Sequence, residues 1–470
     1  MPDGDPFDVR EFGASFKGFM EQMAQQAPAE EPELLQRARQ HFGADPATLP
    51  VVAERFPRHE HPNLQLAIEA YLAVDGRRAD LLGVTAMNDM FGGATALSQL
   101  FIASGGMLPV PAAIGSVAYD NVALDDGRVL PCVSTGLFFV SEGDRRLAVL
   151  VSAPRERLLD SGLGVQVMAP DRAQAEALLA ELRRGMRARS VYRGRIISLE
   201  GARDGVDVKF HHLPRVERDD IVLPGGILER IERHTVRFSE LKDELLRMGR
   251  HLRRGILLYG PPGTGKTLTA MYLASRMPER TTLLLTGQTL GLVEQSCAMA
   301  RLLQPATVIL EDVDLVAGER TQYNVGHHAV LFELLNQMDG LSDDADVLFV
   351  LTTNRPDVLE PALASRPGRI DHAIEIPLPD ETCRGRLLDL YGRGLVLEVA
   401  NRAQLVARTK GVSAAFIREL LRRAALFAAD EGARAVGDTH VDAALRELVV
   451  EGGKLTHSLL GASAIGFQPP

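Results

Sequence analysis

The sequence predicts an α/β fold for the second half of the chain and an α+β fold for most of the first half. In the second half, apolar runs predict buried strands, and a glycine-rich loop joins the first of them to a helical segment at 267–276. In the first half, a strong amphipathic helix is expected at 171–188, with Asp171 as its N-cap. The strand-like runs are 128–140, 146–153 and 164–170 in the first half, and 256–258, 308–310 and 346–354 in the second.

Length and composition limit the class of protein. The chain has 470 residues, too many for one ordinary domain, and its 46% hydrophobic and 24% charged residues are typical of a globular protein. A net charge of −10 argues against a nucleic-acid coat. Cys132, Cys297 and Cys383 lie far apart and form no CxxC pair, which predicts neither a disulfide framework nor a zinc site.

We expect a cytoplasmic protein without a transmembrane segment. The first residues, MPDGDPFDVREF, lack the basic and apolar regions of a signal peptide. The uncharged stretch 90–119 contains five glycines and two prolines, so a continuous membrane-spanning helix is not expected there. Buried core with tight loops is favoured for this stretch over an apolar surface that faces a substrate.

Patterns along the chain predict five segments. The stretch 215–224 is charged, then apolar, then broken by proline and glycine, which is typical of a linker between domains. His59, Glu60 and His61 are too close together for a helical metal pair and predict an exposed polar turn. The segments are a flexible leader at 1–35, an α+β domain at 36–220, an α/β domain at 222–377, a helical domain with four helical segments at 378–452, and a tail at 453–470.

The segment GPPGTGKT at 260–267 is the strongest indication of function. It follows the strand 256–258, opens the helix 267–276 and matches the pattern G-x-x-x-x-G-K-[ST]. Glycines let successive backbone N–H groups surround an anion, and a helix N-terminus adds positive potential. Lys266 is expected to reach the outer phosphates of a nucleotide, and the Thr267 hydroxyl to bind Mg²⁺. The expected nucleotide-binding residues are Gly260, Pro261, Pro262, Gly263, Thr264, Gly265, Lys266, Thr267 and Leu268.

Acidic and amide side chains follow the other two predicted strands of this domain. Glu311 and Asp312 come directly after 308–310, at the carboxyl end of a strand, where ligands of open α/β sheets bind. One acid is expected to hold Mg²⁺ and the other to orient or deprotonate an attacking water. Asn354 ends the next strand and is either a contact to that water or to the γ-phosphate, or a simple turn residue.

Two arginines lie on a rigid turn further along the chain. Arg366 and Arg369 flank Pro367-Gly368 in SRPGRID. Such a turn suits side chains that reach outward, and a guanidinium binds phosphate oxygens in a bidentate manner. In related NTPases an arginine supplied in trans raises the rate by about 10³–10⁵.

Together these motifs resemble the AAA family of the AAA+ superfamily over about 222–450, with LFELLNQMDGL at 331–341 and TTNRPDVLEPAL at 352–363 as further matches. The resemblance implies a P-loop NTPase module with a parallel sheet sandwiched by helices, a small helical lid, and a ring, usually hexameric, with ATP and Mg²⁺ at subunit interfaces. It identifies Glu311 and Asp312 as the Walker B acids, Glu311 holding Mg²⁺ through water, Asn354 as sensor 1, and Arg366 and Arg369 as interface arginines.

Four features depart from the family pattern. The acids are in the order Glu-Asp, so Asp312 at the catalytic position is one methylene shorter than the usual Glu, an order similar to that of the AAA chaperones that assemble mitochondrial complex III. The segment 287–306 lacks the aromatic–apolar–Gly tripeptide of the family's pore, with Leu290-Gly291-Leu292 as its nearest match. One extra residue precedes the interface arginines. Ala414-Ala415-Phe416 replaces Gly-Ala-Asp in the lid, where Arg418 is either a sensor-2 arginine or a surface residue.

The sequence therefore predicts a ring-forming ATPase that remodels, unfolds or assembles a protein partner, a substrate or an adaptor, chosen by residues 36–220. The alternative is a nucleotide-gated assembly factor or scaffold with slow turnover, which the Glu-Asp order and the missing pore aromatic favour. A nucleic-acid motor is less favoured, because the chain has no tryptophan, only 5% aromatic residues and no basic strip.

Overall fold

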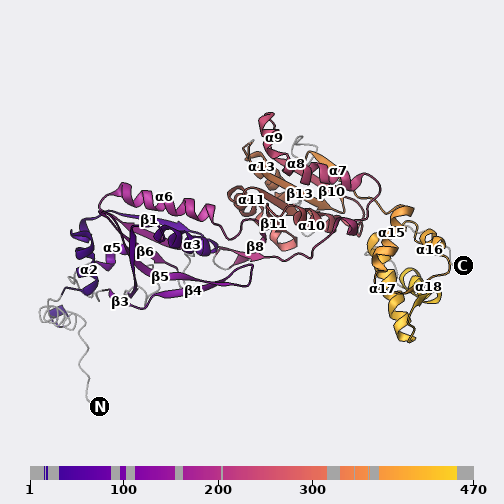
Figure 1. Cartoon of the computed structure of the whole chain (residues 1–470), viewed down its shortest axis with the longest axis horizontal. Coiled ribbons are helices and arrows are strands. Elements are labelled where there is room, and N and C mark those ends of the chain that lie inside the picture. Colours follow the sequence, from indigo (N-terminus) through magenta and orange to yellow (C-terminus); the bar gives the residue numbers. More distant parts are fainter. Residues whose placement is uncertain are drawn as a thin grey trace, which may run out of the picture. The chain divides into compact units, whose positions relative to one another are not determined.

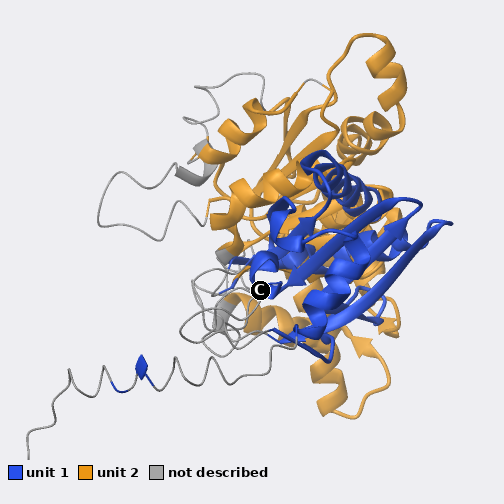
Figure 2. Ribbon diagram, turned by 90° about the vertical axis from the view of Figure 1, so that its left-hand side faces the viewer, with its two compact units in different colours: residues 1–191, 202–206 blue, residues 192–201, 207–470 orange. Residues whose placement is uncertain are grey.

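A computed structural model describes residues 15, 17–18, 31–85, 96–101, 112–153, 162–202, 205–314, 329–342, 344–357, 359 and 370–451. The chain forms two compact units (Figure 2). Unit 1 comprises residues 1–191 and 202–206, and unit 2 comprises residues 192–201 and 207–470. Most of the expected leader, all of the tail and more than half of the uncharged stretch 90–119 lie outside the described residues. The predicted end of the leader at residue 35 is wrong, because a helix begins at Glu33 and Leu34 and Leu35 are buried in the core of unit 1.

Unit 1 is an antiparallel sheet with helices on both faces (Figure 1). Because side chains alternate along a strand, each central strand contributes to two cores. Val149 and Val151 pack with α3 and α6, whereas Ala148 and Leu150 pack with α2 and α5. The sheet order is β1-β7-β6-β5-β2-β3, with β4 on β5. The elements are α2 (Glu33–Phe42), β1 (Val51–Phe56), α3 (His61–Leu72), β2 (Arg77–Thr85), α5 (Leu97–Leu100), β3 (Ala113–Gly115), β4 (Ala118–Ala123), β5 (Val129–Glu142), β6 (Arg145–Ser152), β7 (Leu163–Met168) and α6 (Arg172–Ala188).

The strands β5, β6 and β7 and the helix α6 confirm the local predictions for unit 1. Asp171 caps α6, since its carboxylate accepts a hydrogen bond from the backbone N–H of Gln174 at 2.9 Å. The exposed turn predicted at 59–61 is wrong for His61. His61 begins α3, is 5% exposed, and its Nε2 lies 2.9 Å from the Val133 carbonyl oxygen. Its role is to join helix and sheet.

Unit 2 contains a second sheet, in the order β14-β10-β13-β12-β11-β8-β9. Strands β14, β10, β13, β12, β11 and β8 run parallel. Helices α7 and α10 pack on β10 and β13 in one core, and α11 packs on β11 and β12. The strands are β8 (Ile196–Ala202), β9 (Gly205–Phe210), β10 (Arg254–Tyr259), β11 (Thr281–Leu285), β12 (Ala306–Leu310), β13 (Val347–Thr353) and β14 (His372–Glu375). The helices are α7 (Ile227–His234), α8 (Val236–Glu240), α9 (Lys242–Arg247), α10 (Lys266–Arg276), α11 (Val293–Leu302) and α13 (Ala329–Asp339).

The structure places the division between the units earlier than residue 220. Strand β8 pairs with β11, through Ile196 opposite Thr282 and Ile197 opposite Leu283, so it belongs to the parallel sheet. The stretch 215–224 is not a free linker. Ile221, Val222 and Leu223 are buried, and their apolar side chains pack in the cores of unit 2.

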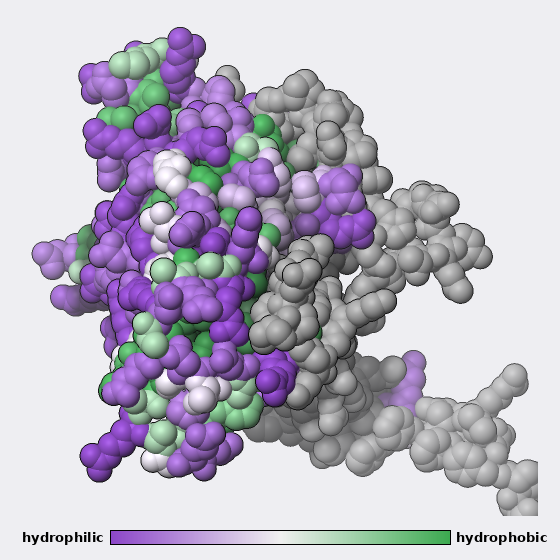
Figure 3. Space-filling model, turned by 90° about the vertical axis from the view of Figure 1, so that its right-hand side faces the viewer, coloured by the Kyte–Doolittle hydropathy of each residue, from purple (hydrophilic) through white to green (hydrophobic). Residues whose placement is uncertain are grey.

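The four predicted helical segments of the C-terminal domain are present as α15 (Glu381–Tyr391), α16 (Arg402–Arg408), α17 (Ala414–Asp430) and α18 (Asp438–Arg446). They share one apolar core, and a short parallel pair, β15 (Leu397–Glu398) and β16 (Val436–Gly437), lies beside them. In the described part of the chain, no helix has the length and apolar character needed to cross a membrane. Figure 3 shows a face on which hydrophilic residues dominate and hydrophobic ones form small separate patches.

Candidate active site

The loop between β10 and α10 has the backbone geometry that anion binding requires. Three of its glycines have positive φ angles: 147° at Gly260, 73° at Gly263 and 104° at Gly265. A Cβ atom at Gly260 would lie 2.2 Å from the Ile376 carbonyl oxygen, so only glycine fits there. The loop therefore turns sharply at the carboxyl edge of the sheet and leads directly into the N-terminus of α10.

Lys266 is the buried cation of this loop. Its Nζ donates hydrogen bonds to the carbonyl oxygens of Gly260 at 2.9 Å and Pro261 at 2.8 Å. Burial lowers the pKa of Lys266 to about 8, and the charges of Asp312 and Asp314 oppose this shift. Carbonyl oxygens carry no full negative charge, so the site favours an anion next to Lys266.

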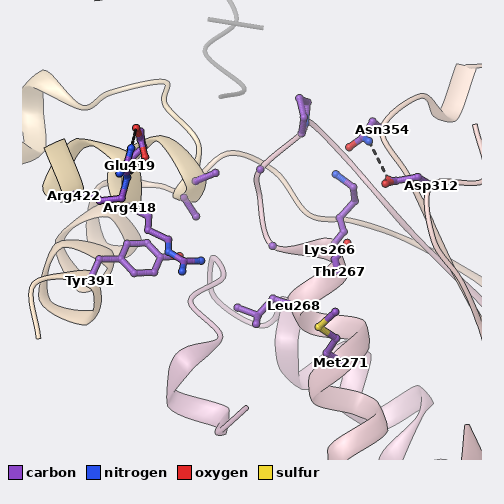
Figure 4. Close-up of a pocket in the computed structure, with 15 residues that line it drawn as sticks. Lys266, Thr267, Leu268, Met271, Asp312, Asn354, Tyr391, Arg418, Glu419 and Arg422 are labelled. Carbon is purple, nitrogen blue, oxygen red and sulfur yellow. Dashed lines mark hydrogen bonds and ion pairs between the residues drawn. The ribbon is translucent and has the colours of Figure 1, made fainter. Parts of the chain in front are cut away.

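Asp312 faces Lys266 from the end of β12, with Asn354 beside it (Figure 4). The Asn354 amide donates to Asp312 Oδ1 at 3.1 Å, and the Asp312 backbone N–H donates to the Thr352 hydroxyl at 3.0 Å. The φ angle of Asp312 is 48°, in the left-handed region that aspartate tolerates better than most residues. Burial and then Asp314 raise the pKa of Asp312, while Lys266 and Asn354 lower it.

Asp314 is a residue of this site that the sequence analysis missed. Its Oδ1 accepts hydrogen bonds from the Thr353 hydroxyl at 2.7 Å and from the Asn354 backbone N–H at 3.1 Å. It thereby ties the end of β12 to the end of β13 and fixes the backbone that carries Asn354. The only sequence signal was a further acid two positions after Asp312.

Glu311 lies next to Asp312 but does not line the pocket. Its backbone N–H donates to the Leu285 carbonyl at 2.9 Å, and its side chain is half-buried. Burial, and then the neighbouring charge of Asp312, raise the pKa of Glu311. Of the predicted loop residues, Pro262, Gly263, Gly265, Lys266, Thr267 and Leu268 line the pocket. Gly260, Pro261 and Thr264 shape the loop behind it, and the Thr264 hydroxyl donates to the Pro261 carbonyl at 2.9 Å.

The pocket has a volume of about 650 Å³, and the helical domain forms its other wall. The α17 N-terminus meets the loop directly, because the Ala415 N–H donates to the Gly263 carbonyl at 3.0 Å. Ser413 caps this helix through the Phe416 N–H at 3.2 Å. Tyr391 and Arg418 face the pocket from the same side (Figure 4). Tyr391 and Met271 are pocket residues that sequence reasoning did not find, since neither belongs to a recognisable motif.

The other arginines of α17 are engaged in ion pairs. Glu419 accepts two hydrogen bonds from Arg422, at 2.7 and 2.8 Å, and one from Arg423 at 2.7 Å. Arg423 also pairs with Glu447 at 2.6 Å. Both Arg418 and Arg422 line the pocket, and of these two Arg422 is already paired with Glu419. Arg366 and Arg369 lie outside the described residues.

The fold and this site define a P-loop nucleotide-binding protein. A model of the family described as "ATPase family associated with various cellular activities (AAA)" matches residues 256–378. The chain is 35% identical over 221 residues to the 26S proteasome regulatory subunit 10B homolog A of Arabidopsis thaliana, which covers 43% of this chain and 55% of that protein. It is 35% identical over 232 residues to the ATP-dependent zinc metalloprotease FtsH 3 of Sorangium cellulosum, a match that covers 46% of this chain and 38% of that protein.

A longer match extends into the N-terminal half. The chain is 32% identical over 338 residues to the proteasome-activating nucleotidase of Methanopyrus kandleri, which covers 68% of this chain and 70% of that protein. The chain belongs to the AAA family of ATPases. For the Arabidopsis subunit, in contrast, the match spans only about half of the relative's length.

Proposed function

We propose that this chain hydrolyses ATP in the presence of Mg²⁺. The observation that carries the proposal is the convergence of Lys266, Asp312 and Asn354 on a pocket that the helical domain closes on its far side. The cavity of about 650 Å³ lies within the usual range for small-molecule sites. The loop glycines and the α10 N-terminus suit the phosphates of a nucleotide.

Each residue has a distinct role in this proposal. Lys266 exchanges its carbonyl partners for the outer phosphate oxygens. The Thr267 hydroxyl, which lines the pocket, would hold Mg²⁺ directly, whereas the carboxylate of Glu311, which does not line it, would act only through a water. Such hard oxygen donors suit Mg²⁺, which would neutralise phosphate charge. Asp312 accepts a proton from the attacking water, a role that its raised pKa favours. The Asn354 amide fixes the position of that carboxylate.

We further propose a homo-oligomeric ring, hexameric as the family resemblance implies, in which Arg366 and Arg369 act on the nucleotide of a neighbouring subunit. Unit 1 would select a protein substrate or adaptor, and the ring would remodel it in the cytoplasm. Leu290, the nearest match to a pore residue, is 1% exposed and so is unsuited to gripping a threaded chain. This favours a concerted movement of the ring over threading.

A nucleotide-gated scaffold with slow turnover is the second candidate. The left-handed backbone at Asp312 and its side chain, one methylene shorter than glutamate, both favour it. A base held further from the attacking water would slow hydrolysis while leaving the loop that binds phosphate intact.

Steady-state ATPase assays and mass photometry of the wild type, Lys266→Ala and Asp312→Asn test these alternatives. A remodelling ATPase should assemble with ATP and turn over at about 1 s⁻¹ or faster. A scaffold should assemble with negligible turnover. Asp312→Asn should lower turnover by about 100-fold or more and retain bound ATP. If Glu311→Gln gives this result and Asp312→Asn does not, Glu311 is the proton acceptor and Asp312 the residue that holds Mg²⁺. Undiminished turnover in Lys266→Ala would rule out the site.

A further inference from the structure

Two neighbouring rows of side chains cross β2, β5 and β6 of unit 1, on opposite faces of the sheet. In the first row, Arg77, Glu142 and Arg145 are cross-strand partners. Glu142 accepts hydrogen bonds from Arg77 at 2.9 Å and from Arg145 at 3.1 Å. Arg77 also pairs with Glu181 of α6 at 3.0 Å. The carboxylates of this row neutralise its arginines.

The second row also has one arginine on β2 and one on β6, but the residue between them on β5 carries no carboxylate. Arg78 and Arg146 are the cross-strand partners of Ser141, one on each side. Arg146 donates to the carbonyl oxygens of Gly143 and Arg145, at 2.5 and 2.9 Å. Within the described parts of the chain, neither Arg78 nor Arg146 pairs with an acidic side chain. Ser141 therefore stands where the first row has its central glutamate.

Arg78 and Ser141 of this row line a groove of about 550 Å³ between α2 and the sheet, and Arg146 is the partner of Ser141 on the next strand, β6. Arg37 and Gln40 line it from α2, and the buried ring of Phe139 forms part of the floor. Asp80 also lines the groove, and its carboxylate pairs with Arg37 at 3.5 Å. Arg37 pairs with Glu33 as well, at 3.1 Å, so its charge is already neutralised. Burial keeps the pKa of His41, also on α2, below its ordinary value, so His41 adds no charge near neutral pH.

We propose that this groove binds an acidic segment of a partner protein, with one carboxylate seated between Arg78 and Arg146. Strands lie about 4.8 Å apart, so arginines two strands apart can both reach a carboxylate placed over Ser141. Gln40 and Arg37 extend the polar lining along α2, which suits an extended chain better than a single small anion. The chain as a whole carries a net charge of −10, so the attraction is local to this row.

The direct test is fluorescence anisotropy of the full chain with a fluorescein-labelled, acetylated and amidated hexaglutamate peptide, without ATP. The wild type should bind saturably at low salt. Ser141→Glu recreates the first row and should weaken binding at least tenfold, because its carboxylate occupies the place of the ligand. Ser141→Gln introduces a side chain of the size of glutamate but without its charge, so its Kd for the peptide should stay within about threefold of the wild-type value.

Arg78→Ala should weaken binding by about tenfold, and Arg172→Ala by less than about twofold, since Arg172 is exposed on α6 at the other face of the sheet. Equal binding by Ser141→Glu and Ser141→Gln, or no saturable binding by the wild type, would overturn the proposal. Free glutamate and unlabelled hexaglutamate can each be tested as competitors of the labelled peptide. If free glutamate displaces it at the same concentration as the unlabelled peptide, the groove binds a single small anion and not an extended protein segment. ATPase activity should be unchanged in all these variants, so a failure here is separable from a failure of the proposed ATPase.

Discussion

At the scale of single residues, the protonation of Lys266 links nucleotide binding to pH. Its pKa of about 8 in the absence of phosphate means that the charge is present below pH 8 and is lost as the pH rises through 8. A bound phosphate favours the charged form, so ATP binding requires proton uptake at high pH. We expect the Kd for ATP to rise about tenfold between pH 7.5 and pH 9.

This dependence can be measured by calorimetry or with a fluorescent ATP analogue. Lys266→Arg keeps its charge over the whole range and serves as the matched control, for which the Kd should change less than about twofold. A wild-type Kd that stays constant from pH 7.5 to pH 9 would contradict the lowered pKa of Lys266.

Asp314 is expected to act as a positioning residue for Asn354. Asp314→Ala removes the acceptor of two hydrogen bonds, at 2.7 and 3.1 Å, and should lower kcat by about tenfold or more with little change in KM. Asp314→Asn keeps an amide oxygen as acceptor and should restore most of the kcat. A rise in KM with unchanged kcat, or an Asn variant as slow as the Ala variant, would argue against positioning.

At the scale of elements, one buried ion pair joins three parallel strands of unit 2. Arg280 is 4% exposed; it pairs with Asp346 at 2.5 Å and donates to the Ala306 carbonyl and the Thr307 hydroxyl. Asp346→Ala would leave the Arg280 charge buried without its partner. We expect a loss of about 3–5 kcal/mol in the free energy of unfolding.

Urea denaturation followed by circular dichroism checks this prediction. The matched control is Asp357→Ala, which removes an exposed partner of Arg355 at 3.2 Å and should cost less than about 1 kcal/mol. Equal losses in the two variants would mean that Asp346 does not stabilise the sheet in this way.

The elements also show what the sequence could and could not predict. The strands β10, β12 and β13, the glycine loop and the helix α10 follow from local patterns, because apolar runs and glycine spacing are properties of short segments. The hydrogen bond that the Thr353 hydroxyl donates to Asp314 joins residues 39 positions apart, and the pocket position of Tyr391 depends on how α15 packs. The pairing of β8 with β11 likewise joins strands that lie far apart in the sequence, so no local pattern predicts it.

At the scale of the whole molecule, the proposed ring can be tested by mixing two inactive variants. A subunit with Arg366→Ala keeps an intact phosphate-binding loop, and a subunit with Lys266→Ala keeps intact Arg366 and Arg369. In random rings of equal proportions, about a quarter of the interfaces would combine an intact loop with an intact arginine. We expect ATPase activity to recover in proportion. Co-assembled but fully inactive rings would contradict an arginine supplied in trans.

The position of β8 has a consequence for any shortened form of this protein. A fragment beginning near residue 222 would contain every recognised nucleotide-binding motif but would lack β8 and β9. The edge of β11, with Thr282 and Leu283, would then present unpaired backbone groups to solvent. An exposed, apolar edge strand is a template for pairing with other chains, so such a fragment should aggregate. A fragment that begins at Tyr192 keeps that edge covered.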